Sequence, residues 1–302
     1  MVKLDKILNK ITYTKVYVSN KDLVINNIIG LKDVKGKDNI ITWCNEKGFQ
    51  DVIKLTNSTI IIYDTVDYEL LPTSNNYIFC ENPRKEFQTM LKEFFLPEKK
   101  MGISNSAFIN STVKLGTNPY IGNNVVIEDN CIIGNNVHIE HNTVIYRNTV
   151  IGNNVFIGAN NTIGCCGFGY EKDEIGNWEL IPHIGNVVIE NNVEIGNNNS
   201  IDRAVLGSTL LKENSKVDNL VHIAHGVTIG KNSAIIANAM IAGSVVIGDN
   251  VWVAPSSSII QKVTIGDNSL VGLGAVVIRD VVENAVIVGN PAKIINKQNK
   301  NI

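Results

Sequence analysis

Neither an excess of one charge nor a long apolar run is present in this sequence. Its 302 residues contain 27 Lys and Arg against 29 Asp and Glu, which gives a formal net charge of −2 and a pI near 6.2. This balance excludes a general affinity for nucleic acid or for an anionic membrane. No stretch approaches the roughly 20 consecutive apolar residues of a membrane span, and residues 1–4 do not open a signal segment. We therefore expect a cytoplasmic protein.

Cysteine and aromatic residues are also few. The five cysteines form an odd set without the spacing of a metal site, so reduced thiols are expected rather than a disulfide framework. Aromatic residues make up 6% of the chain, whereas 44% of it is hydrophobic and 24 residues are glycine. This composition provides enough core for one long domain or two modest ones.

Aliphatic residues instead recur at every sixth position, without a miss from Ile103 to Ile163 and again from Val217 to Val277. Neither a helix, with about 3.6 residues per turn, nor a β-hairpin meander has such a period. A short fixed period is typical of a solenoid, whose units bury their apolar faces by stacking on one another. Three hexads close one coil of a triangular prism, and each hexad supplies a short strand and a corner.

The corners carry the sequence Ile-Gly-Asn-Asn-Val, for example at 121–125, 133–137 and 151–155. Glycine and asparagine tolerate the positive φ that a tight corner requires, so the pattern predicts the turns together with the core. It resembles the hexapeptide-repeat proteins, and that resemblance implies a left-handed parallel β-helix. The usual right-handed rule for crossovers would not have predicted this hand.

The six-residue step is absent from residues 1–98. Apolar runs at 60–63 and 77–80, followed by an amphipathic segment at 83–95, predict a small α/β domain there. The expected fold is therefore mainly β, with this domain preceding the β-helix.

The β-helix is expected over 99–288, with a short tail at 289–302. Its step breaks between Ile163 and Ile189 and again between Ile201 and Val217, which predicts loops at 164–188 and 202–216. Interruptions of a regular solenoid tend to carry function, because regular coils need only stability.

The sequence in and after the first interruption resembles the UDP-3-O-acylglucosamine N-acyltransferases of lipid A (lipopolysaccharide) synthesis. The resemblance is carried, in order, by Gly167-Phe168-Gly169-Tyr170, Gly176-Asn177-Trp178, Ile181-Pro182-His183, Ile201-Asp202-Arg203 and Ile223-Ala224-His225. It implies an acyltransferase, a homotrimer with sites between neighbouring prisms, and a nucleotide-binding role for residues 1–98.

Acylation of a sugar amine needs a base for the amine proton and a donor for the developing oxyanion. Histidine suits the first task because its ordinary pKa is near neutrality. His225 follows the inward Ile223 by two residues and so lies at a corner, and the resemblance makes it the general base. His138 and His141 repeat the same local pattern in a regular coil without the motif, and we interpret them as structural.

Several other residues are candidates for the site. Asp202 either orients a histidine or binds a sugar hydroxyl, and Arg203 holds a phosphate; a surface ion pair between them is the alternative. His222 points outward and is either functional or solvated, whereas His183 replaces an amide side chain of the family and lines the cleft. Phe168, Tyr170 and Trp178 either wall the acyl or sugar site or pin the loop to the prism.

In residues 1–98 the resemblance implies that an aromatic ring stacks on the base of the nucleotide. Trp43 fits this ring, but the amide expected at a fixed distance is displaced, since Asn45 comes one residue too early and Glu46 takes its place. The nucleotide is therefore left open between UDP and dTDP.

The end of the chain resembles coenzyme A-dependent sugar acetyltransferases instead, through the ending Gly289-Asn290-Pro291-Ala292-Lys293. That resemblance implies acetyl-CoA as cosubstrate, with Gly274 and Ala275 presenting backbone groups to the thioester arm. Lys293 either meets a phosphate or is an ordinary tail lysine.

The sequence thus predicts an N-acyltransferase of a UDP- or dTDP-linked amino sugar, with acetyl-CoA as the preferred donor and no permanently bound cofactor. A lipid A enzyme that takes its acyl group from acyl carrier protein is the alternative. Two further readings are a zinc carbonic anhydrase, which the few scattered histidines disfavour, and a non-catalytic solenoid scaffold.

Overall fold

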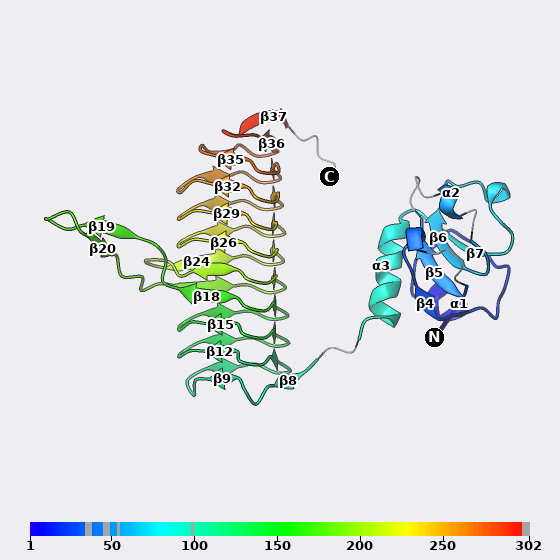
Figure 1. Ribbon diagram of the computed structural model, residues 1–302, viewed down its shortest axis with the longest axis horizontal. Coiled ribbons are helices and arrows are strands. Elements are labelled where there is room, and N and C mark those ends of the chain that lie inside the picture. Colours follow the sequence, from blue (N-terminus) through cyan, green and yellow to red (C-terminus); the bar gives the residue numbers. More distant parts are fainter. Residues whose placement is uncertain (34–37, 45–48, 53–54, 98–99, 298–302) are drawn as a thin grey trace. The chain divides into compact units, whose positions relative to one another are not determined.

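The computed structural model describes residues 1–302 except 34–37, 45–48, 53–54, 98–99 and 298–302. It divides the chain into two compact units, Met1–Lys99 and Lys100–Ile302 (Figure 1). Each unit has its own apolar core. No helix in the described ranges has both the length and the apolar character needed to cross a membrane.

Within its described residues, the first unit is built on a mixed sheet of five strands in the order β2-β7-β6-β5-β4. The β2–β7 pair is antiparallel and the other pairs are parallel. The strands of this sheet are β2 (Lys15–Tyr17), β4 (Asn27–Ile28), β5 (Ile40–Trp43), β6 (Thr59–Tyr63) and β7 (Asn76–Cys80). The remaining elements are β1 (Val2–Lys3) paired with β3 (Val24–Ile25), the helices α1 (Leu4–Leu8), α2 (Phe49–Val52) and α3 (Pro83–Phe94), and the 3-10 turns Leu31–Asp33 and Tyr68–Leu70.

Side chains of this sheet alternate between two apolar clusters. Ile61 and Ile78 belong to the cluster that packs against α3, whereas Ile60 and Phe79 belong to the other. Since neighbouring residues of a strand point to opposite faces, the two clusters lie on the two faces of the sheet. Asn82 caps α3 by accepting a hydrogen bond from the backbone N–H of Lys85, and Pro83 takes the first helical position.

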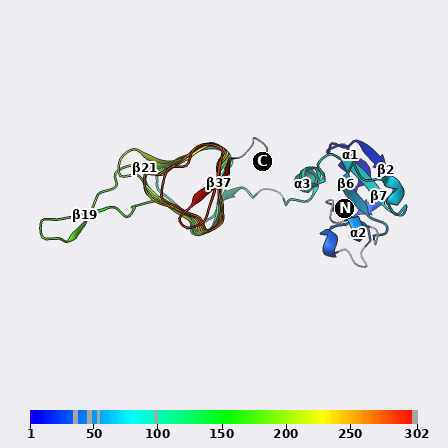
Figure 2. The ribbon, with the colours of Figure 1, turned by 90° about the horizontal axis from the view of Figure 1, so that it is seen from above.

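The second unit is a left-handed parallel β-helix with a triangular cross-section (Figure 2). In its described residues the strands stack into three sheets. The first sheet contains β10 (Lys114–Leu115), β13 (Ile132–Ile133), β16 (Val150–Ile151), β21 (Asn186–Ile189), β24 (Ser208–Leu211), β27 (Thr228–Ile229), β30 (Val246–Ile247) and β33 (Thr264–Ile265). The second contains β9 (Phe108–Ile109), β12 (Val126–Ile127), β15 (Val144–Ile145), β18 (Thr162–Cys165), β23 (Ser200–Asp202), β26 (His222–Ile223), β29 (Met240–Ile241), β32 (Ser258–Ile259) and β35 (Val276–Val277).

The third sheet contains β8 (Gly102–Ile103), β11 (Tyr120–Ile121), β14 (His138–Ile139), β17 (Phe156–Ile157), β22 (Glu194–Ile195), β25 (Lys216–Val217), β28 (Ala234–Ile235), β31 (Trp252–Val253), β34 (Leu270–Val271), β36 (Ala285–Val288) and β37 (Lys293–Lys297). Residues 18 apart occupy the same place in successive regular coils, as Ile121 and Ile139 do. The sixth-position residues fill the core, and Ile121 and Ile139 are fully buried. Ile103, in the first coil, is 47% exposed because only one neighbouring coil covers it.

Glycine and asparagine have different structural roles at the Ile-Gly-Asn-Asn-Val corners. The second asparagine of each corner, such as Asn124 or Asn136, adopts the positive φ. The preceding glycine does not adopt it but allows the coils to approach: a Cβ on Gly134 would lie 2.5 Å from the carbonyl oxygen of Gly152. The turn itself was therefore expected correctly. In the Ile-Gly-Asn-Asn-Val corners the positive φ belongs to asparagine, whereas Gly226 and Gly274 adopt it at two other corners.

Both interruptions are shorter than the predicted loops at 164–188 and 202–216. β21 already pairs with β16 and β24, and Val187 and Leu211 are fully buried in the prism. The first excursion therefore spans 166–185 and the second spans 203–207. The apolar residues at their ends resume the core before the six-residue step becomes recognisable in the sequence.

The first excursion carries an antiparallel hairpin of β19 (Tyr170–Lys172) and β20 (Trp178–Leu180), which projects away from the prism (Figures 1 and 2). Asp173 holds its turn by accepting hydrogen bonds from the backbone N–H groups of Ile175 and Asn177. At the other end of the chain, β37 folds back antiparallel onto β36, so that residues 293–297 of the predicted tail form a strand of the prism.

Candidate active site

His225 lies at the corner that follows β26. Ile223 is fully buried in the core, and two residues later the His225 side chain leaves it and is half-buried. In several regular coils the same position of the hexad holds an asparagine such as Asn135 or Asn153, whose side-chain oxygen accepts a backbone N–H from the preceding coil. An ionisable ring therefore replaces a structural amide at this corner.

Two glycines leave room for the His225 ring. Gly243 has the same corner position one coil later, and a Cβ there would lie 2.7 Å from Nε2 of His225. Gly167, from the first excursion, lies on the other side, where a Cβ would be 3.1 Å from Nδ1. Packed side chains do not tolerate the first of these contacts and rarely the second. The position of the ring therefore requires glycine at 243, and glycine at 167 avoids a second close contact.

The first excursion also brings His183 against His225. The two rings meet edge to face with their centroids 5.2 Å apart, and His183 is only 5% exposed. Nδ1 of His183 lies 2.7 Å from the carbonyl oxygen of Ile181. A Cβ on Gly169 would be 3.1 Å from Cε1 of His183, so this glycine too makes space for an imidazole.

Asp202 lies at the end of β23, one coil before His225, and is 4% exposed. One carboxylate oxygen accepts a hydrogen bond from the Cys165 thiol at 3.2 Å, and the other lies 3.7 Å from Nε2 of His222. Burial raises the pKa of Asp202 and also raises the pKa of Cys165, to about 11, so the thiol keeps its proton as a donor. Asp202 thus contacts His222 directly and acts on His225 only through its charge.

The environment favours the neutral form of the His225 ring. Burial lowers its pKa, the neighbouring His183 lowers it further, and the negative charge of Asp202 partly offsets both. A buried imidazole with a lowered pKa carries a free lone pair near neutral pH, which is the form that accepts a proton.

The bacterial transferase hexapeptide model (six repeats) matches residues 112–147, 130–165 and 244–279, and the hexapeptide repeat of succinyl-transferase matches 226–254. The UDP-3-O-acylglucosamine N-acyltransferase of Protochlamydia amoebophila is 35% identical over 243 residues, which cover 73% of this chain and 68% of that relative. The chain belongs to the UDP-3-O-acylglucosamine N-acyltransferase family.

Other members of this family match over different shares of their length. The Cytophaga hutchinsonii enzyme is 40% identical over 221 residues, 66% of this chain and 63% of the relative. A Francisella tularensis enzyme is 40% identical over 74 residues, and the match spans only 22% of its length. Among solved structures, a UDP-N-acetylglucosamine acyltransferase from Bacteroides fragilis superimposes with a TM-score of 0.59 at 25% identity, over 64% of this chain and 73% of that one.

Arg203, predicted to hold a phosphate, is instead built into the prism. It is 4% exposed, and its guanidinium donates from Nε to the carbonyl of Gly164 at 2.6 Å and from Nη2 to that of Arg147 at 3.3 Å. The alternative of a surface ion pair with Asp202 is also wrong, because both side chains are buried. The family motif includes this arginine, but only the fold shows that its guanidinium binds the backbone carbonyl of Gly164 at the bulge of β18.

The loop aromatics of the family motif do not pin the excursion to the prism. Phe168 and Trp178 are 84% and 67% exposed, and Tyr170 contacts Phe168 with ring centroids 4.7 Å apart. Lys172 places its ammonium 5.0 Å above the Trp178 ring. These rings lie on or at the base of the projecting hairpin, where they are available to a ligand or a second chain.

In the first unit, Trp43 ends β5 and packs at a tilt against Phe87, with ring centroids 6.5 Å apart. Beside it lies a cavity of about 510 Å³, which the start of α3 completes with Arg84 and Lys85. Asn45 and Glu46, the residues that left the nucleotide open, lie outside the described residues. The predicted aromatic platform thus adjoins a cavity with positive charge.

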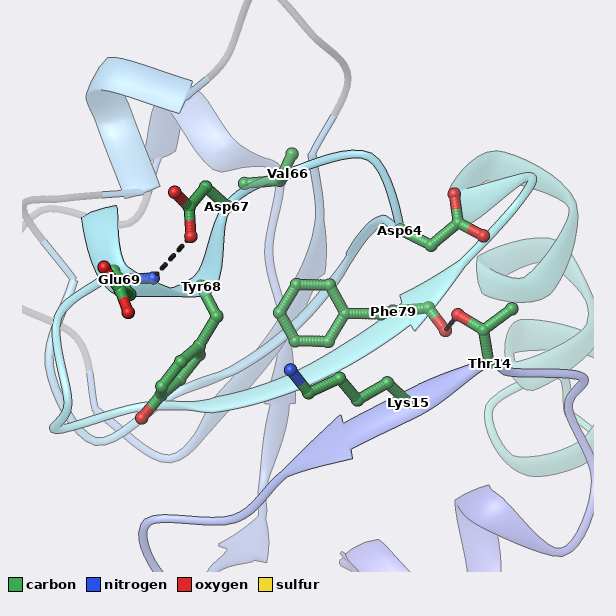
Figure 3. A pocket seen from close by; sticks show the side chains of 8 residues that line it. All are labelled: Thr14, Lys15, Asp64, Val66, Asp67, Tyr68, Glu69 and Phe79. Atoms are coloured by element: carbon green, nitrogen blue, oxygen red, sulfur yellow. Dashed lines mark hydrogen bonds between the residues drawn. The ribbon is translucent and has the colours of Figure 1, made fainter.

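A second cavity, of about 560 Å³, lies on the opposite face of the same sheet, and no sequence pattern indicated it. Figure 3 shows the Phe79 ring above the Lys15 side chain and the Tyr68 ring to the left of the Lys15 ammonium. The Lys15 ammonium is 5.5 Å from the Tyr68 ring and 5.9 Å from the Phe79 ring. Asp64, on the far side in Figure 3, adds a carboxylate.

The residues predicted to bind coenzyme A have their backbone groups largely engaged. The N–H of Gly274 donates to Pro255, the N–H of Ala275 donates to Gly272, and the carbonyl of Ala275 accepts from Ser258. The Ala275 N–H is thus bonded within its own corner and its carbonyl to the neighbouring coil, an arrangement that does not favour presentation of these groups to a thioester arm. Lys293 lies exposed on β37.

Sequence reasoning missed Cys165, Gly167 and Gly243 as parts of the site. Gly243 carries a readable signal, because glycine replaces the larger residues that the hexads on either side have at this position, such as Ala237 and Asp249. The contact of Cys165 with Asp202 depends on the bulge between β18 and β23, and no spacing in the sequence reveals it. The described residues contain no group of three or more His, Cys, Asp and Glu placed to hold a metal ion.

Proposed function

We propose that this protein N-acylates a UDP-linked 3-O-acylated glucosamine, with His225 as the general base. The half-buried His225 ring between Gly167 and Gly243 carries this proposal, because a neutral imidazole is held there with a lowered pKa and space around it. Membership of the N-acyltransferase family supports this choice of acceptor. It favours this acceptor over the broader set of amino sugars that the sequence left open.

In the proposed reaction the sugar amine attacks the carbonyl carbon of an acyl thioester. The C–N bond forms, Nε2 of His225 takes one proton from the amine nitrogen, and the tetrahedral oxyanion collapses as the C–S bond breaks. His225 then returns its proton to the leaving thiolate, so that an amide and a thiol result. The base ends each cycle neutral and ready for the next acceptor.

The oxyanion needs a fixed donor, and the backbone N–H of Gly243 is suited to it. In regular corners this N–H donates to a side-chain oxygen one coil later, as that of Asn135 does to Asn153. One coil after Gly243 the residue is Gln261, and within the described residues no such bond forms. An N–H beside the base that is not used by the coil can stabilise developing negative charge.

The site in the first unit supports nucleotide recognition. Trp43 offers a ring for stacking, and Arg84 and Lys85 beside the same cavity offer positive charge for a diphosphate. A non-catalytic scaffold would need neither this cavity nor the glycines around His225.

Donor and acceptor are tested together with the purified full-length chain. UDP-3-O-acylglucosamine is incubated with hydroxyacyl-acyl carrier protein or with acetyl-CoA, and the amide product is measured by mass spectrometry. Product with the carrier protein supports the family activity, and product with acetyl-CoA alone identifies an N-acetyltransferase, as the ending of the chain predicts. A dTDP-linked amino sugar serves as the comparison acceptor. Absence of product with both donors and both acceptors overturns the proposal.

A further inference from the structure

The corner that carries His225 lacks a bond that its counterpart makes. At the same position of the hexad, on another edge of the prism, Nδ1 of His141 accepts the backbone N–H of Asn123, one coil earlier, at 2.8 Å. The residue one coil before His225 is Arg203, but its N–H donates instead to the carbonyl of Cys165. The bulge in β18 has thus released the Nδ1 atom of His225 from the corner ladder.

The released nitrogen is buried beside another nitrogen in the same condition. Among the described residues, neither Nδ1 of His225 nor Nε2 of His183 has a hydrogen-bond partner, although both atoms are buried. A Cβ on Gly167 would lie 3.1 Å from the first and 3.0 Å from the second, so both atoms border the same small space. Two buried polar atoms left unpaired are costly, and a bond between them satisfies both.

The protein backbone decides which of the two rings donates. Nδ1 of His183 lies 2.7 Å from the carbonyl oxygen of Ile181, and a carbonyl can only accept, so that nitrogen carries the proton. In the neutral ring Nε2 is then an acceptor. His225 can satisfy this acceptor only as the tautomer with its proton on Nδ1, which leaves the lone pair on Nε2.

We propose that His183 is a positioning residue, which accepts a hydrogen bond from Nδ1–H of His225, directly or across one water, and so fixes Nε2 of His225 as the base. Nε2 is the nitrogen that Gly243 keeps clear. The inference rests on the proposed function for its catalytic consequence, but the tautomer itself is a property of the free protein. It assigns to a backbone carbonyl and a second imidazole the task that a carboxylate performs beside many catalytic histidines.

The other charged groups near His225 do not perform this task. Asp202 bonds to Cys165 and lies near His222, and His222 contributes only through its charge. His183 is therefore the group that touches the released face of the His225 ring, and the pH profile of any variant must be interpreted with Asp202 and His222 present.

The tautomer is tested by NMR on the full-length chain labelled with 15N-histidine, which gives signals from five residues only. In the wild type we expect Nδ1 of His225 protonated and Nε2 unprotonated. His183→Leu removes the acceptor and is expected to mix the two tautomers. His183→Gln keeps an acceptor oxygen and is expected to retain the wild-type tautomer, which also keeps the test valid if the leucine variant folds poorly.

Activity gives a second readout. We expect His183→Leu to lower kcat about tenfold to a hundredfold with KM little changed, and His183→Gln to recover most of the loss. His138→Leu, in a regular coil, is the matched control and should leave the rate and the His225 signals unchanged. A wild-type His225 protonated on Nε2, or a His183→Leu variant with unchanged tautomer and kcat, overturns the inference. If no donor supports transfer but the tautomer behaves as expected, the proposed function fails and this pairing stands.

Discussion

Two coils of this prism carry nearly the same four residues, and only one of them forms a candidate active site. His138-Ile139-Glu140-His141 belongs to a regular coil, whereas His222-Ile223-Ala224-His225 lies beside the first excursion. In the regular coil every imidazole is engaged by its own stack. His138 stacks between the rings of Tyr120 and Phe156 and contacts Glu140 at 2.8 Å, while His141 accepts a backbone N–H.

The coil that carries His222 and His225 lacks those partners. Ala224 stands where Glu140 would supply a carboxylate, the preceding backbone N–H turns to Cys165, and Gly243 leaves the ring uncovered above. A histidine at a solenoid corner is therefore structural by default. In the proposed function His225 serves as a base because the neighbouring coils do not form the bonds that engage His141.

The sharpest test of this contrast is to remove each corner histidine in turn. His225→Ala should lower kcat about 10² to 10⁴-fold, since general-base assistance is lost. His141→Ala, at the same corner position of a regular coil, should stay within about twofold because that ring only bonds the corner. Steady-state kinetics on both variants measures the difference, and comparable losses in the two would contradict the distinction drawn between the coils.

A methyl group at position 243 should also remove the difference between the two coils, because it displaces the His225 ring instead of deleting it. Gly243→Ala places a Cβ 2.7 Å from Nε2 of His225, so the ring must shift, and a misplaced base costs about tenfold to a hundredfold in kcat. The coil that follows His141 already has Ala159 at this position, so a Cβ there is compatible with the prism. Thermal unfolding should therefore be little changed. A variant with wild-type kcat would show that the ring does not need this space.

The pH profile gives the smallest expected effect. The base acts when neutral, so kcat/KM falls as pH drops through the pKa of His225, which burial and His183 have lowered. Asp202 raises that pKa, and Asp202→Asn should therefore move the acid limb to lower pH. Asp173→Asn, at the hairpin turn, is the control and should leave the limb in place. A shift of the Asp202→Asn limb to higher pH would contradict the assignment of the titrating group.

Much of the fold follows from local rules that operate within one coil. An aliphatic residue at every sixth place and corners rich in glycine and asparagine are readable in the chain, and they predicted the prism correctly. The ends of the interruptions were less predictable. Val187 and Leu211 return to the core before the hexad pattern resumes, and whether an isolated apolar residue is buried depends on the coil that stacks on it.

The candidate site was predictable only in part. The family motif indicated His225 and His183 as site residues. It also predicted that Arg203 binds a phosphate, which is wrong because the Arg203 side chain is turned inward and donates to the carbonyl of Gly164 at the bulge. Roles of this kind depend on which backbone groups the next coil has already used. No spacing within one coil contains that information.

The sequence by itself determined the repeating element, its corners and the presence of a histidine at a corner that differs from the others, because these depend on residues six or fewer apart. The tertiary structure alone decided which bonds that histidine keeps. An excursion of the chain brings Gly167 and His183 against it and diverts the Arg203 amide to Cys165, and these contacts join residues from three different stretches of the chain. An imidazole takes its protonation and its tautomer from its neighbours in space, and in a stacked solenoid those neighbours are one coil away.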